Sequence, residues 1–75
     1  MKKLTFKFRN AEFFVEISGK DIWYVDKYRR TNMVQSMTTS ELAEYDKAKS
    51  EEDLVNICKR DCIKKGFVFV KEENL

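Results

Sequence analysis

The two cysteines, Cys58 and Cys62, are four residues apart, a spacing that could serve redox or metal chemistry. On a helix this spacing places the two Cβ atoms about 5 to 6 Å apart, whereas a disulfide requires roughly 3.5 to 4.5 Å. A structural zinc site takes four ligands, and the chain has no histidine and no further cysteine. We therefore expect two unbridged thiols that act as small buried apolar side chains, and neither a metal nor a cofactor.

The acidic residues Glu51, Glu52 and Asp53 form the densest group of carboxylates in the chain. They directly follow Ser50 at the predicted start of a helix, where carboxylates interact favourably with unpaired amides and the positive end of the dipole. General acid–base catalysis usually uses histidine or carboxylates held in a pocket, and two isolated glycines cannot build a phosphate-binding loop. We therefore expect a protein that is not an enzyme.

Aromatic and basic side chains are interleaved in residues 23–30. Three further residues of these types are expected on the exposed sheet face beside this segment. Together the candidate binding residues are Phe14, Trp23, Tyr24, Lys27, Tyr28, Arg29, Arg30, Lys7 and Arg9. Trp, Tyr and Arg are enriched at protein interfaces, but the same types also contact phosphates and stack on bases. A purely structural interpretation places Trp23 in the core, Tyr24 opposite Phe14 on the next strand, and Arg29 and Arg30 in solvent.

The formal net charge of +2 is too small by itself to indicate a nucleic-acid partner. Residues 1–37 carry eight basic and four acidic side chains, whereas residues 38–75 carry seven and nine. Glu12 and Glu16 interrupt the basic face of the predicted sheet. Their charge disfavours a phosphate backbone more than a protein surface, which can supply complementary cations.

Alternating apolar and polar residues predict a three-stranded meander in the first third of the chain. The alternation covers residues 3–9 and 12–18 and is typical of strands with one buried face. Short polar breaks, the second of which contains Gly19, supply the turns, so that residues 22–26 return beside the second strand. Residues 26–37 show no clear period, and we expect a loop there rather than an extension of the third strand.

Two helices are predicted after this loop. Thr38 and Glu41 fit a capping box, which indicates a short helix up to Ala48. A longer helix over residues 51–65 begins with acidic residues, ends with basic ones and stops at Gly66. Its apolar stripe consists of Leu54, Val55, Ile57, Cys58 and Cys62.

The apolar run in residues 67–70 predicts a last strand, over residues 67–71, that is covered on both faces or lies inside the sheet. One arrangement pairs it with the first strand. The predicted fold is an α+β two-layer sandwich of order βββααβ, with a mainly antiparallel sheet of three to four strands and both helices on one face. Phe6, Val15, Leu54, Cys58 and Phe69 should be buried.

The length of 75 residues predicts one compact domain over residues 1–75. No apolar run approaches the roughly 20 residues needed to span a bilayer, and the amino terminus lacks the core of a signal peptide, so we expect a cytoplasmic location without a membrane. Because a domain of this size has a small stability margin, a homodimer is an alternative that the sequence leaves open.

These patterns favour a small non-enzymatic binding module, an adaptor or regulator, that acts through a protein interface. We expect the interface on the exposed sheet face and in segment 23–30. The alternative is a nucleic-acid-binding protein that uses the same basic and aromatic surface. The small size and the lack of catalytic groups suit an accessory protein of a mobile element or a bacterial regulator.

Overall fold

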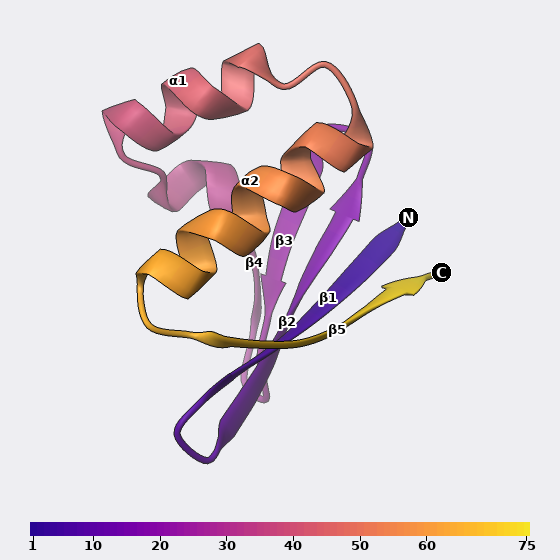
Figure 1. Cartoon of the computed structure of the whole chain (residues 1–75), viewed down its shortest axis with the longest axis vertical. Coiled ribbons are helices and arrows are strands. Elements are labelled where there is room, and N and C mark those ends of the chain that lie inside the picture. The colour runs from indigo at the N-terminus through magenta and orange to yellow at the C-terminus, as the bar shows by residue number, and fades with distance from the viewer.

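The computed structural model describes residues 1–75 as one five-stranded sheet with two α-helices and a short 3₁₀ helix (Figure 1). The strands are β1 (Lys2–Phe8), β2 (Ala11–Ser18), β3 (Asp21–Val25), β4 (Arg30–Asn32) and β5 (Val68–Asn74). The helices are η1 (Met33–Ser36), α1 (Thr39–Lys47) and α2 (Glu51–Lys64). The strand order is β4-β3-β2-β1-β5, and every neighbouring pair is antiparallel. The predicted two-layer α+β fold is confirmed.

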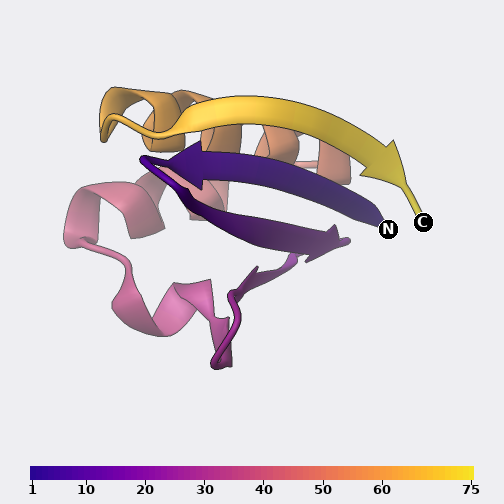
Figure 2. The same cartoon turned by 90° about the horizontal axis from the view of Figure 1, so that it is seen from below.

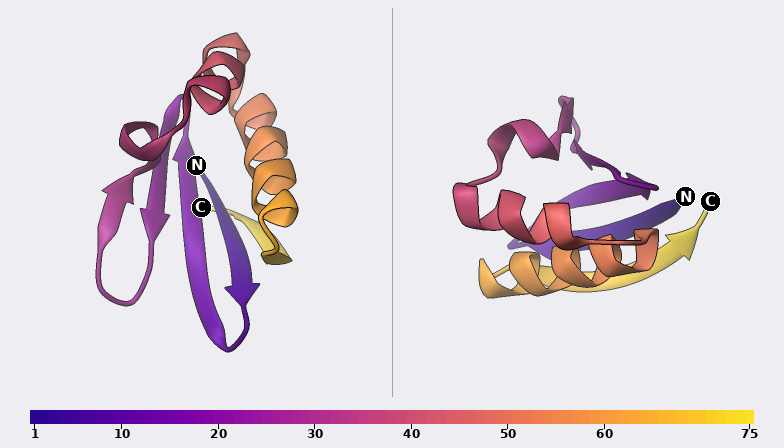
Figure 3. Two further views of the ribbon diagram at one scale, coloured as in Figure 1. Left: turned by 90° about the vertical axis from the view of Figure 1, so that its left-hand side faces the viewer. Right: turned by 90° about the horizontal axis from the view of Figure 1, so that it is seen from above.

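The helices lie on one side of a strongly twisted sheet, as the left panel of Figure 3 shows. We call the covered side the inner face and the other side the outer face. The buried apolar core between the layers consists of Leu4, Phe6, Phe13, Val15, Ile17, Ile22, Ala48, Leu54, Val55, Cys58 and Cys62. Of the five residues expected in the core, only Phe69 is half-buried rather than buried.

Two tight turns build the predicted meander. Arg9 and Asn10 connect the paired residues Phe8 and Ala11, and Arg9 adopts a positive φ of 56°. The second turn contains Gly19, with a φ of 59°, a conformation that glycine adopts without a steric penalty. Positive φ values of this kind match the twist of two-residue hairpin turns, which explains why both connections remain short.

The loop expected over residues 26–37 is wrong in part. Arg30–Asn32 form the short edge strand β4, and Met33–Ser36 form η1. The Asn32 side chain accepts a hydrogen bond from the Val34 amide at 3.0 Å and begins the 3₁₀ turn. A three-residue strand and one 3₁₀ turn are too short to give a recognisable period, which is why the sequence pattern does not predict them.

Side-chain caps fix the ends of both α-helices. The Thr38 hydroxyl accepts from the Glu41 amide at 3.2 Å while Glu41 Oε1 accepts from the Thr38 amide at 3.0 Å, a complete capping box. At the start of α2 the Ser50 hydroxyl accepts from the Asp53 amide at 3.1 Å, and Asp53 Oδ2 accepts from the Lys49 amide at 2.9 Å. At the other end, Gly66 has a φ of 95°, and the amide that follows it donates to the Cys62 carbonyl at 3.0 Å. The predicted extents of the two helices are therefore confirmed to within one residue.

The turn between β2 and β3 is bound to the junction between the helices. Lys20 Nζ donates to the carbonyl oxygens of Tyr45 at 2.6 Å and Ala48 at 3.1 Å, and the Tyr45 hydroxyl donates back to the Lys20 carbonyl at 2.6 Å. The Gly19 amide adds a bond to Glu51 Oε2 at 3.0 Å. These contacts hold the helical layer at one end of the sheet, whereas the opposite hairpin ends extend beyond the helices (Figure 1).

The last strand pairs with β1, as one predicted arrangement had it, but the expectation of a strand covered on both faces is wrong. β5 is an edge strand, in which Val68 is 63% exposed and Val70 is 45% exposed. The β1–β5 register shifts between Thr5 and Phe6, which leaves Val70 without a partner in a bulge. Helix α2 covers this strand mainly at Phe69, so Val68 and Val70 remain in solvent.

Candidate binding surface on the outer sheet face

Strand register places a half-buried apolar group in the middle of the outer face. Phe14 on β2 lies opposite Val25 on β3, and Val25 lies opposite Arg30 on β4. Trp23 lies in the adjacent cross-strand row, between Glu16 and Asn32. Phe14, Trp23 and Val25 are each partly exposed. No helix covers this side of the sheet, so the group is accessible to a partner (Figure 3).

Cations lie directly over the two aromatic rings of this group. The Arg30 guanidinium carbon is 4.1 Å from the Trp23 ring centroid, and Arg30 Nε is 3.2 Å from Glu16 Oε1. Lys3 Nζ is 4.0 Å from the Phe14 ring centroid. Stacking on an aromatic face and pairing with a carboxylate both restrict the arginine, so Trp23, Arg30 and Glu16 form a pre-organised unit.

We define the outer-face surface as Lys3, Phe14, Glu16, Trp23, Val25 and Arg30. Its surroundings are nearly neutral because the adjoining cations have acidic neighbours. Lys7 lies opposite Glu12 on the adjacent strand, and Lys71 Nζ is 3.7 Å from Glu73 Oε1. A phosphate backbone would have to displace these carboxylates, whereas a protein partner could use the apolar centre directly.

The structure contradicts the interpretation that put Trp23 in the core and Tyr24 opposite Phe14. Tyr24 pairs with Val15 and lies on the inner face, so Trp23 lies on the outer face. The turn decides this, because a two-residue connection pairs Ser18 with Asp21 and places Ile22 in the core at 3% exposure. Alternation counted from the turn at Gly19 would therefore have placed Trp23 on the outer face of the sheet.

Tyr24 contributes to an aromatic row on the inner face instead. Its ring centroid is 5.1 Å from that of Phe13, which in turn is 5.0 Å from that of Phe67. Burial raises the pKa of Tyr24, and the neighbouring Asp26 carboxylate adds to the rise. The phenol is therefore neutral at physiological pH, and its removal would disturb the core rather than the outer-face surface.

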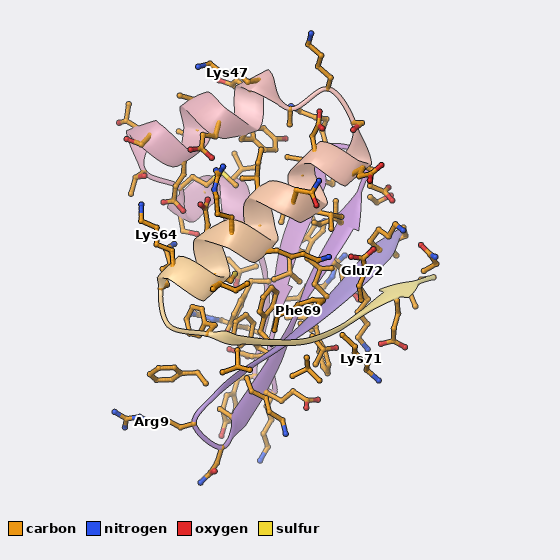
Figure 4. The ribbon with its side chains drawn as sticks, viewed as in Figure 1. Arg9, Lys47, Lys64, Phe69, Lys71 and Glu72 are labelled. Atoms are coloured by element: carbon orange, nitrogen blue, oxygen red, sulfur yellow. The ribbon has the colours of Figure 1, made fainter.

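Four other predicted site residues gather at the free ends of the hairpins. Arg9 lies in the β1–β2 turn, and Lys27, Tyr28 and Arg29 lie in the β3–β4 turn at the same end of the sheet (Figure 4 labels Arg9). Tyr28 is 85% exposed, and none of the three cations forms an ion pair. We call these four residues the hairpin-tip group.

Asp26 shapes the β3–β4 turn. Its Oδ1 accepts from the backbone amides of Tyr28 at 2.8 Å and Arg29 at 2.9 Å, which is the local bonding that favours aspartate in turns. The hydrogen bond from the Tyr28 amide contributes most to lowering the pKa of the Asp26 carboxyl, and the bond from the Arg29 amide adds to this effect. The ionised form is therefore a structural part of the turn, and the adjacent cations project from a fixed backbone.

The outer-face surface also contains three residues, Lys3, Glu16 and Val25, that are not among the predicted binding residues. Glu16 and Val25 belong to it because they lie opposite Trp23 and Phe14, and Lys3 belongs to it because it lies diagonally across from Phe14 and its Nζ contacts that ring. Thr5 lies below this surface, opposite Phe14 and Lys71 on its two neighbouring strands, and is only 1% exposed. Only the strand register, not residue type, identifies these neighbours.

The cysteines lie on the inner side, remote from these surfaces. Both are unbridged and buried in the core between the layers. Beside them is a cavity of about 40 Å³ that is also lined by Met33 and Met37. Their mutual hydrogen bond, together with burial, raises the pKa of the Cys58 thiol, and the same bond lowers that of Cys62. The structure has no group of three or more histidine, cysteine or acidic side chains placed to hold a metal ion.

None of the helices combines the length and the apolar character required to cross a membrane. Comparison with protein-family models, with curated proteins and with solved structures finds no match to this chain.

Proposed function

We propose that the chain is a small non-enzymatic binding module, an adaptor or regulator, and that its outer-face surface binds another protein. The observation that carries this proposal is the unit formed by Trp23, Arg30 and Glu16. It presents a half-exposed indole whose neighbouring cation is already neutralised at 3.2 Å. Tryptophan and arginine dominate the binding energy of many protein interfaces, particularly at the centre of an otherwise weakly contributing contact area.

The shape of the candidate surface supports the same conclusion. Phe14, Val25 and Trp23 offer apolar area on a rigid sheet, so a partner would order few side chains on binding. The flanking charges of both signs, such as Lys7 and Glu12, form the polar rim that interfaces usually have. This arrangement favours a protein surface with its own mixture of charges over a uniformly anionic polymer.

One observation favours nucleic acid as the second candidate. The hairpin-tip group presents Arg9, Lys27 and Arg29 without ion pairs, next to the exposed ring of Tyr28. Unpaired cations beside an aromatic ring are typical of surfaces that contact phosphates and stack on bases. In this alternative, binding would use the hairpin tips more than the outer-face surface.

The two candidates can be separated by capture of partners on the immobilised protein before and after nuclease treatment. If the outer-face surface binds protein, capture survives nuclease, and Trp23→Ala weakens it by about 30-fold or more, the effect of losing an interface hot spot. Phe8→Ala is the matched control, because Phe8 is an exposed aromatic residue, at 44%, on the inner face of the sheet. Circular dichroism of each variant verifies that the fold is retained.

The nucleic-acid alternative predicts a different set of results. Direct titration with duplex DNA or single-stranded RNA would then show binding that Lys27→Ala with Arg29→Ala abolishes and that Trp23→Ala leaves unchanged. With three phosphate contacts to duplex DNA, a fourfold rise in salt would weaken the affinity by roughly 40-fold. That outcome would reject the protein-interface proposal and assign function to the hairpin-tip group.

A further inference from the structure

The free edge of β5, the side of the strand away from β1, is a row of backbone groups without partners. β5 is seven residues long, pairs with β1 alone and is the last strand of the sheet. In Figure 1 it lies nearest the viewer, with no helix or loop in front of it. The opposite edge strand, β4, has only three residues. Since an uncovered strand edge is a template for pairing with another strand, β5 is the edge that can recruit one.

The backbone direction of the regular part of β5 follows from its last hydrogen bond. The Leu75 amide donates to the Met1 carbonyl at 2.9 Å and so faces β1. Peptide groups alternate in direction along a strand, which turns those of Glu73 toward β1 and those of Glu72 and Asn74 toward the free edge. An added antiparallel strand would therefore form its hydrogen bonds with Glu72 and Asn74.

The charge pattern of β5 is complementary to that of a second β5 strand that runs antiparallel to it. Lys71 and Glu73 both lie on the outer face, with side chains 60% and 41% exposed. Glu72 points to the other side of the strand, as Figure 4 shows, where its carboxylate lies 2.6 Å from Lys59 Nζ and 3.4 Å from Lys2 Nζ. A second β5 strand that runs antiparallel about Glu72 would place each Lys71 opposite Glu73 of the other copy.

We propose that β5 pairs with β5 of a second copy of this chain, antiparallel and centred on Glu72, so that the two sheets become continuous. The register pairs the two Glu72 residues through their backbone groups at the free edge and creates two cross-strand Lys71–Glu73 pairs. The two Glu72 residues meet at the axis, but each carboxylate is neutralised by Lys59 of its own chain. An unrelated strand without this charge pattern would not supply the two additional cross-strand charge pairs, which favours self-pairing.

This dimer is independent of the proposed function, since Lys71 and Glu73 are outside the outer-face surface. Because one strand pair buries little area, we expect a dissociation constant on the order of 10 to 100 μM. The oligomeric state is measured by sedimentation velocity over a concentration series around that range. The variants are Lys71→Glu, Glu73→Lys and the double exchange, all at exposed positions.

Each single charge reversal should weaken the dimer about tenfold or more, because it converts two attractive pairs into two repulsive ones. The double exchange should restore it. An equimolar mixture of the Lys71→Glu and Glu73→Lys variants should form a heterodimer, because every cross-strand pair is then attractive again. A wild-type monomer throughout the concentration series, equal dimerisation of all variants, or a mixture that stays monomeric would each overturn the proposal.

Discussion

Replacing Thr5 by valine should stabilise the protein. Thr5 is 1% exposed, and its Oγ1 is the one buried side-chain oxygen or nitrogen without a hydrogen-bond partner. Burial of an unsatisfied hydroxyl costs about 1 to 3 kcal/mol in proteins. Valine has nearly the same shape, favours strands equally and adds a methyl group where the hydroxyl was. We therefore expect Thr5→Val to raise the free energy of unfolding by about 1 to 2 kcal/mol.

Urea denaturation followed by circular dichroism measures this difference, and thermal unfolding should show a rise of roughly 4 to 8 °C per kcal/mol for a domain of this size. An unchanged slope against urea verifies that the surface exposed on unfolding is the same. Thr31→Val is the matched control, because Thr31 is only half-buried on β4 and should respond little. A loss of stability in Thr5→Val would mean that the hydroxyl has a favourable partner, and the reasoning from burial would be refuted.

Three further predictions concern the helical layer. Leu54→Ala should lower the free energy of unfolding by about 2 to 5 kcal/mol, whereas Ile63→Ala, at 55% exposure, should change it by less than about 0.5 kcal/mol; equal effects in urea denaturation would refute the packing described. The hydrogen bond from the Thr38 amide lowers the pKa of Glu41 in the folded protein. The ionised carboxylate therefore stabilises the fold fully above about pH 4.3, the usual pKa of glutamate in an unfolded chain. This contribution is lost as the pH falls through the lower pKa of the folded state. Urea midpoints in this range should depend less on pH in Glu41→Gln, and an unchanged dependence would contradict this. Freshly purified protein should have the same intact mass with and without reductant, because both cysteines are unbridged; a loss of two hydrogens in the non-reduced protein would contradict this.

Local signals carried most of the fold prediction. The capping box at Thr38 and Glu41, the acidic start of α2 and the glycine at its end each act over a few residues, so the helix boundaries could be inferred from sequence alone. The first two hairpins were equally predictable, because alternation and short turns define antiparallel neighbours. Neither inference required knowledge of the tertiary structure.

Non-local features could not be inferred in the same way. The run around Val68 and Val70 has the composition of a buried strand, but burial depends on which elements reach it, and α2 covers mainly Phe69. The candidate site was predicted as one cluster and is divided among the outer face, the hairpin tips and the inner face. Trp23 and Tyr24 are adjacent in sequence yet lie on opposite faces, so proximity along the chain was a poor guide to a shared surface.

The pairing of β1 with β5 constrains when the fold can be completed during synthesis. Lys3 lies opposite Glu73, so the second edge of β1 stays unoccupied until residues 68–74 have been synthesised (Figure 2). The β1–β2 and β2–β3 hairpins can form from local contacts, whereas this last pairing requires closure of a long loop and should be slow. Until then Phe6 lacks its edge contact with Phe69, and the nascent chain exposes a strand edge for chaperones to protect.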